Sequence, residues 1–130
     1  MENIKTRIEL SNYINNNKDK HIIIKAGAAW CGPCKKMKPL FNNLLCDLVK
    51  NNNNSNIIYL EMDVDVDKDC CNYLRIKGIP HILYINEGEL NQSMVGFESG
   101  KLCKLFKYIN KQIQLCNKNK IELKKVKKKI

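Results

Sequence analysis

Two cysteines separated by two residues, Cys31-Gly32-Pro33-Cys34, are the strongest chemical signal in the sequence. Apolar residues follow them at three- and four-residue steps, which predicts a helix that starts at this motif. This stripe contains Met37, Leu40, Phe41, Leu44, Leu45 and Leu48. Unpaired backbone N–H groups and the helix dipole favour an anion at such a start. We therefore expect the pKa of Cys31 to be lowered, so that a thiolate forms near neutral pH.

Two thiols at this spacing are suited to dithiol–disulfide exchange. Cys31 attacks a substrate disulfide and forms a mixed disulfide, and Cys34 then attacks Cys31 and releases the reduced substrate. Cys34 lies one turn further into the helix and is expected to be the less exposed of the two. Pro33 stiffens the turn and lacks an N–H that would have no helical partner. The motif predicts an enzyme, a thiol–disulfide oxidoreductase with Cys31 as nucleophile and Cys34 as resolving cysteine.

Metal binding is the main alternative for a pair of cysteines at this spacing. A structural zinc site needs four ligands, and the sequence contains no second pair of this kind. The only histidines, His21 and His81, are far apart in sequence, and Cys70 and Cys71 are adjacent. We therefore expect no metal and no bound cofactor. The five cysteines outside the motif are interpreted as small core or surface residues, with a regulatory thiol at Cys70 or Cys71 as the alternative.

The length and the start of the chain indicate a single intracellular domain. A chain of 130 residues can bury a core without disulfides or metals. The start, Met1-Glu2-Asn3, has no basic stretch followed by an apolar one, and no run of about eighteen apolar residues occurs. We expect no membrane insertion, a cytoplasmic location where the seven cysteines are thiols by default, and a monomer.

Positive charge is concentrated at the C-terminus. From Asn117 onward the chain has seven lysines and one glutamate, which is +6 of the net +10. We therefore divide the chain into a domain, 1–116, and a basic C-terminal tail, 117–130. The tail either extends the last helix or is disordered. A polybasic segment can contact nucleic acid or an acidic surface, but a solvated tail is the favoured interpretation.

Hydrophobic patterning predicts alternating helices and strands, hence an α/β fold. The helix that starts at the motif lies between a buried strand at Ile22–Ile24 and another that begins at Ile57. The other expected elements are helices at Arg7–Asn16 and Lys68–Tyr73, strands at His81–Ile85 and Leu90–Phe97, a last helix capped by Ser99, and a further strand around Asn3–Thr6. Parallel crossovers in the first half and a tight turn at Glu87-Gly88 predict a mixed central sheet of four to five strands, flanked by four helices on both faces.

Several segments resemble the thioredoxin family. Trp30 to Lys35, followed by Pro39, resembles its active-site segment, and Ile76–Pro80 resembles its cis-proline segment. Val95-Gly96 resembles the segment of the family that contains the glycine before the last helix. The likeness spans about Arg7 to Gln114 and leaves out the tail. It implies the thioredoxin fold, a redox-active centre for electron transport and redox homeostasis, disulfide-containing protein clients, and recycling by an NADPH-dependent thioredoxin reductase.

The resemblance also assigns roles around the dithiol. Pro80 is implied to be cis and to lie against the dithiol, which exposes the backbone of Ile79 to a client peptide. Trp30 is implied to be a flat apolar lip beside Cys31, with core packing as the alternative. Asp65 is implied to accept a hydrogen bond from the Trp30 indole. The other site-shaping residues that we carry over are Gly32, Pro33 and Gly96.

Three positions depart from the family pattern. Typical members carry a buried aspartate five residues before the tryptophan, and here that residue is Lys25. Its ammonium either stays charged and stabilises the thiolates, becomes a neutral base for Cys34, or extends to solvent with little effect. Gly27 stands where an aromatic residue is common. His81, after Pro80, is either a titrating group near the site or, as we favour, an exposed bystander.

These departures keep two alternatives to a general reductase open. The first is a specialised thioredoxin-like oxidoreductase with a narrow client, which Lys25 and Gly27 favour. The second is a binding or adaptor module that uses the fold with little turnover. The presence of both motif cysteines favours an enzyme.

Overall fold

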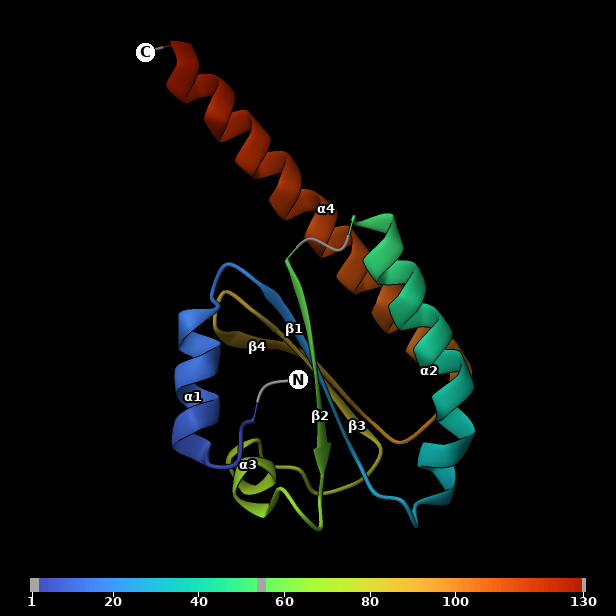
Figure 1. Cartoon of the computed structure of the whole chain (residues 1–130). Coiled ribbons are helices and arrows are strands. Elements are labelled where there is room, and N and C mark those ends of the chain that lie inside the picture. The colour runs from blue at the N-terminus through green and yellow to red at the C-terminus, as the bar shows by residue number, and fades with distance from the viewer. Residues whose placement is uncertain (1–2, 54–55, 130) are drawn as a thin grey trace.

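A four-stranded mixed sheet forms the centre of the molecule, in the order β2-β1-β3-β4. The computed structural model describes residues 3–53 and 56–129. Helices α1 and α3 cover one face of the sheet and helices α2 and α4 cover the other (Figure 1). In chain order the elements are α1 (Arg7–Asn16), β1 (His21–Gly27), α2 (Gly32–Asn51), β2 (Ile57–Asp63), α3 (Lys68–Tyr73), β3 (His81–Asn86), β4 (Glu89–Val95) and α4 (Ser99–Lys129).

The central strand β1 is β-branched and buried, and it connects the two hydrophobic cores. It pairs parallel with β2 and antiparallel with β3, which in turn pairs antiparallel with β4. Successive side chains of a strand point to opposite faces. Ile22 and Ile24 therefore belong to the core under α1 and α3, whereas Ile23 belongs to the core under α2 and α4. Lys25 lies on the same face as Ile23, beneath α2.

The helices dock through apolar stripes and are held by specific end contacts. Phe41 of α2 and Ile109 of α4 are fully buried in the same core. Helix α1 starts at Thr6, whose hydroxyl accepts a hydrogen bond from the Glu9 N–H while the Glu9 carboxylate accepts one from the Thr6 N–H. An ion pair 2.7 Å long between Arg7 and Asp69 then ties α1 to α3.

The fold class is confirmed, with local corrections to the predicted elements. Residues 3–6 form no strand, because Thr6 is used as the cap of α1. Strand β4 ends at Val95, two residues earlier than predicted, because Gly96 adopts a φ of +83° that leaves the extended conformation. Ser99 is the first residue of α4 rather than a cap that precedes it.

The C-terminal tail continues the last helix. Helix α4 runs through position 116 without a break, and its end projects beyond the sheet (Figure 1). Ile113 is fully buried, whereas Ile121 and Leu123 are more than half exposed. A functional division at 116–117 stays a prediction. Within residues 3–53 and 56–129 no helix combines the length and apolarity that a membrane crossing needs.

Candidate active site

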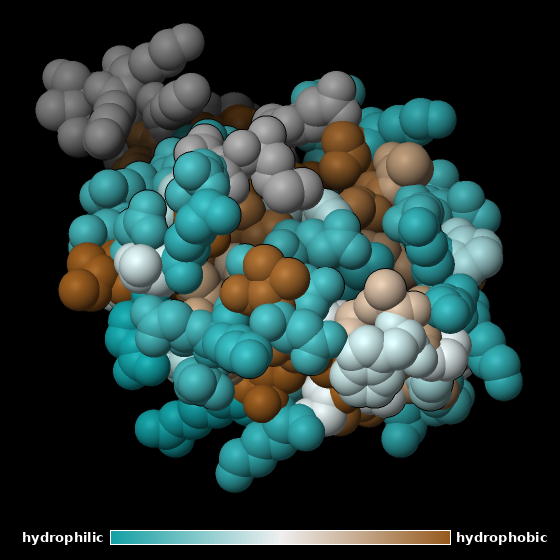
Figure 2. Space-filling model, turned by 60° about the horizontal axis from the view of Figure 1, so that its bottom comes forward, coloured by the Kyte–Doolittle hydropathy of each residue, from teal (hydrophilic) through white to brown (hydrophobic). Residues whose placement is uncertain are grey.

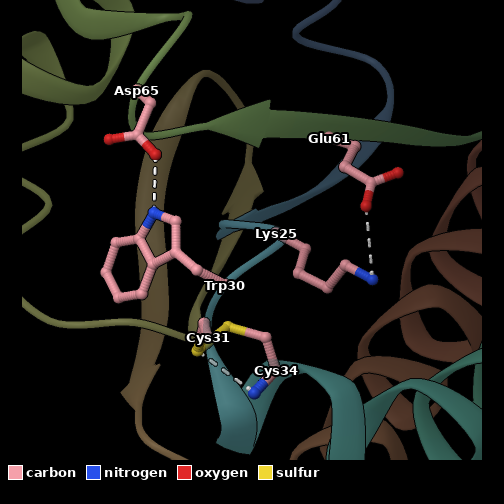
Figure 3. The surroundings of a disulfide bond; sticks show 6 residues. All are labelled: Lys25, Trp30, Cys31, Cys34, Glu61 and Asp65. Atoms are coloured by element: carbon pink, nitrogen blue, oxygen red, sulfur yellow. Dashed lines mark hydrogen bonds and ion pairs between the residues drawn. A yellow bond between two sulfur atoms is a disulfide. The ribbon is translucent and has the colours of Figure 1, made fainter.

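The two motif cysteines lie at the N-terminus of α2 and are joined by a disulfide (Figure 3). Cys31 is the N-cap residue, and its extended backbone turns into the helix at Gly32. The Cα atoms of the two cysteines are 5.2 Å apart. The backbone N–H of Cys34 donates a hydrogen bond of 3.2 Å to Cys31 Sγ. Together with the helix dipole, this donor stabilises negative charge on the Cys31 sulfur once the disulfide is reduced.

The burial of the two cysteines is the reverse of the order expected from the sequence. Cys31 is 4 % exposed, whereas Cys34 is partly exposed. The cause is a cavity of about 520 Å³ that is lined by Cys34, by Pro80 and by the segment 25–29. That segment is Lys25 followed by alanines and one glycine, so nothing bulky covers this side of Cys34. The run Ala26-Gly27-Ala28-Ala29 was the sequence signal for this cavity.

Trp30 forms an exposed lip beside Cys31. The residue is 67 % exposed, which excludes the core-packing alternative. Its indole N–H donates a hydrogen bond of 2.7 Å to Asp65 Oδ2, the bond that the resemblance implied (Figure 3). This bond fixes the ring to the loop after β2.

The segment around Pro80 lies against the dithiol. The Ile79–Pro80 peptide bond is cis, and Pro80 lines the same cavity as Cys34. The N–H of Gly96 donates a hydrogen bond of 2.8 Å to the Pro80 carbonyl, which connects the start of β3 to the end of β4. The structure thus brings Pro80, Gly96 and the motif together, while Gly32 and Pro33 lie exposed on the first turn of α2.

The Lys25 side chain runs from β1 to the surface of the cavity. Its ammonium lies 4.5 Å from the centre of the Phe41 ring. It also lies 3.5 Å from Glu61 Oε1 (Figure 3). The side chain is only 12 % exposed, whereas that of Glu61 is 54 % exposed. Glu61 is the neighbour of Lys25 across the parallel pair β1–β2. The cation therefore reaches a carboxylate at the edge of the solvent, next to the cavity that contains Cys34.

His81 is buried, and the expectation of an exposed bystander is wrong. The residue is 8 % exposed, and neither ring nitrogen has a hydrogen-bond partner. The side chain is enclosed because β3 is flanked on both sides, with Ala26 and Val95 as its cross-strand neighbours. Burial lowers the pKa of His81 from its usual value of 6.5.

This burial makes the fold sensitive to acid. Since the pKa of His81 is lower in the folded chain than in the unfolded one, the unfolded chain binds more protons as the pH falls through about 6.5. The contribution of neutral His81 to folding stability is therefore fully present above that pH and decreases as the pH falls below it. His81→Phe is expected to lose less free energy of unfolding than the native chain between pH 7.5 and pH 5.5. Urea titrations at the two pH values measure this, and equal losses would contradict it.

The cysteines outside the motif do not lie at the dithiol. Cys70 and Cys71 are buried in the core beneath α1 and α3. Burial, and secondarily Asp67, raise the pKa of Cys71 to about 11. Both are therefore protonated, inaccessible thiols. No group of three or more histidine, cysteine or acidic side chains placed to hold a metal occurs in the described ranges 3–53 and 56–129.

The chain is similar to known thioredoxins in sequence and in structure. The family model described as Thioredoxin matches residues 3–111. Thioredoxin of Sus scrofa is 28 % identical over 102 residues, which are 78 % of this chain and 91 % of the relative. Thioredoxin of Mus musculus is 34 % identical over 84 residues, which are 65 % of this chain and 74 % of the relative.

Solved structures agree with this relationship. Fasciola hepatica thioredoxin superimposes with a TM-score of 0.66 at 23 % identity and covers 80 % of this chain and 94 % of its own. Reduced Schistosoma mansoni thioredoxin gives a TM-score of 0.65 at 26 % identity and covers 82 % and 94 %. The disulfide-bonded pair at the start of α2, the fold and these similarities lead to one conclusion. The chain belongs to the thioredoxin family and is a thiol–disulfide oxidoreductase.

Proposed function

We propose that the chain is a protein disulfide reductase in which Cys31 is the nucleophile and Cys34 the resolving cysteine. The observation that carries this assignment is the hydrogen bond from the Cys34 N–H to Cys31 Sγ at the N-terminus of α2. A thiolate at Cys31, the N-cap residue, receives this bond and the field of the helix, whereas Cys34 is the third residue of the helix.

The proposed reaction transfers two electrons from the dithiol to a client. The Cys31 thiolate attacks one sulfur of the client disulfide, a Cys31–client bond forms, and the other client sulfur leaves as a thiolate. Cys34 then loses its proton and attacks Cys31 Sγ. This step closes the Cys31–Cys34 bond and expels the second client thiolate. The dithiol is oxidised and the client disulfide is reduced.

Client docking is proposed to use the surface around Cys31. Trp30 and Gly32, the neighbours of Cys31 in the sequence, are exposed, and Cys31 itself is 4 % exposed. Ile79 precedes the cis proline and offers its backbone to an extended client segment, and Gly96 leaves room beside it. The face of the molecule that comes forward when its lower end is turned to the viewer is mainly hydrophilic with smaller hydrophobic areas (Figure 2).

Recycling of the oxidised dithiol is proposed to come from an NADPH-dependent thioredoxin reductase. The five free cysteines are consistent with a reducing compartment such as the cytoplasm. Insulin reduction with NADPH and thioredoxin reductase tests the proposal. A protein disulfide reductase accelerates the precipitation of insulin B chains above the rate without the protein. No acceleration, either in this assay or with dithiothreitol as the reductant, would favour an adaptor with little turnover.

Lys25 is proposed to shift the redox balance of the dithiol. A cation beside the cavity stabilises thiolates and hence the reduced form, so reversing its charge favours the disulfide. Lys25→Asp is expected to be more reducing, by about fivefold in its equilibrium constant with glutathione, because water screens the interaction. Lys36→Asp, an exposed position on α2 that does not line the cavity, is the control. An unchanged constant in Lys25→Asp would show that the lysine is chemically silent.

A further inference from the structure

The cavity beside Cys34 is a second approach to the dithiol. It has a volume of about 520 Å³, and Cys34 is among the residues that line it while Cys31 is not. Cys34 therefore separates Cys31 from the cavity. Displacement at a disulfide sulfur proceeds with the attacking thiolate opposite the leaving sulfur. Because Cys34 lines the cavity and Cys31 does not, a thiol in the cavity meets Cys34 first.

Gly27 keeps this approach open. A Cβ atom at position 27 would lie 3.3 Å from Cys34 Sγ, which is tighter than most contacts of that kind. Any side chain larger than hydrogen would therefore begin against the sulfur and extend over it. The residues on either side, Ala26 and Ala28, add only methyl groups. The absence of side-chain bulk at one position accounts for the partial exposure of Cys34.

The leaving group favours attack at Cys34 over attack at Cys31. When a thiolate attacks Cys34 Sγ, the sulfur of Cys31 is expelled, and the better-stabilised thiolate leaves faster. Cys31 Sγ accepts the N–H of Cys34 and lies at the helix N-terminus. Attack at Cys31 would instead expel Cys34, which has no such stabilisation from the N-cap position.

The charges around the cavity favour a small thiol that carries carboxylates. Lys35 and Lys38 line the cavity from α2, and within the described residues neither forms an ion pair. Asp63 and Asp67 also line the cavity. The Asp63 carboxylate accepts the backbone N–H of Asp65, and the Asp67 carboxylate accepts the backbone N–H of Asp63. Glu61 is paired with Lys25. Among the described residues, Lys35 and Lys38 are thus the cations of the lining that no carboxylate pairs, and they are the groups that can meet a carboxylate of a ligand.

We propose that a small carboxylate-bearing thiol of the size of glutathione enters this cavity and exchanges directly with Cys34. Its thiolate attacks Cys34 Sγ, the Cys31–Cys34 bond breaks, and Cys31 leaves as a thiolate. A second thiol molecule then attacks the bound one, which gives its disulfide and a Cys34 thiolate. Two molecules of the thiol are oxidised and the protein disulfide is reduced. The inference rests on the dithiol chemistry proposed above and adds a second substrate class and a second reactive sulfur.

The test uses Cys31→Ser, in which Cys34 is the remaining motif thiol, and glutathione disulfide as the probe. Peptide mapping by mass spectrometry locates the adduct, because Cys46 is also exposed. We expect a glutathione adduct at Cys34, formed about tenfold more slowly when Gly27→Val is added, since reactivity depends on access. Gly27→Ala, which adds only the Cβ, serves if the valine variant does not fold. Lys36→Ala is expected to leave the rate unchanged.

Two results would overturn the inference. One is an unreactive Cys34 in Cys31→Ser, and the other is a rate that neither Gly27 variant lowers. A Lys35→Ala/Lys38→Ala variant is further expected to react more slowly with glutathione disulfide but not with the uncharged hydroxyethyl disulfide. Equal slowing with both would contradict the charge assignment. A failure of the proposed reductase function would be seen in a different experiment. Insulin reduction through Cys31 is measured in the native chain, whereas the reaction of Cys34 with glutathione disulfide is measured in Cys31→Ser.

Discussion

Cys31→Ser is expected to lose insulin reduction by three orders of magnitude or more, roughly the loss that follows removal of a covalent nucleophile. A serine hydroxyl does not ionise near neutral pH and cannot form the mixed disulfide, even though the helix N-terminus and the Cys34 N–H remain in place. The measurement is the steady-state rate with NADPH and thioredoxin reductase. Cys46→Ser removes an exposed cysteine away from the motif and is the matched control, with an expected rate equal to that of the native chain. Substantial turnover in Cys31→Ser would contradict the assignment.

Phe41→Ala is expected to lower the free energy of unfolding by about 3–5 kcal/mol, as for other fully buried aromatic residues. The ring is 0 % exposed and contacts Phe106 edge-on, with 5.5 Å between the ring centres, and Tyr59, with 5.6 Å. It also forms the surface below the Lys25 ammonium. Its removal therefore leaves a cavity between α2 and α4 and takes away the aromatic face beneath a cation.

Urea unfolding at neutral pH measures this loss. Val66→Ala, at a position that is 74 % exposed, is the control and is expected to change stability by less than about 0.5 kcal/mol. Phe41→Leu keeps most of the apolar volume and is expected to lie between the native chain and Phe41→Ala. A loss below about 1 kcal/mol in Phe41→Ala would mean that this core repacks around the gap.

Local sequence patterns were enough to predict most of the fold. The short helix Lys68–Tyr73 has the predicted bounds, and the helix after the motif starts within one residue of Cys31. These elements depend on apolar spacing and on turn residues that are adjacent in sequence. The predicted strand at Asn3–Thr6 is wrong. Thr6 can serve either as a strand residue or as a helix cap, and here its hydroxyl accepts the N–H of Glu9 as the cap of α1.

The side-chain environments at the site could not be predicted in the same way. Which residues cover Cys34 depends on the segment 25–29 and on Pro80, which are distant in sequence from one another. His81 was expected to be exposed, because the position after a proline gives no information on the strands that flank it. The direction of the Lys25 ammonium is set by Glu61, its neighbour on β2 across the parallel register. In each case a partner far along the chain decides the burial or the direction of the side chain.

Trapping of a client through a single cysteine tests the central assignment most directly. Cys34→Ser retains the Cys31 thiolate and removes the group that releases the client. The Cys31 thiolate attacks a disulfide of insulin, so this variant is expected to accumulate a mixed disulfide between Cys31 and an insulin chain. Non-reducing electrophoresis detects the adduct, and mass spectrometry of its peptides locates the linkage. Cys31→Ser is expected to trap no protein client. Accumulation of the insulin adduct in Cys31→Ser and not in Cys34→Ser would contradict the assignment of Cys31 as the nucleophile.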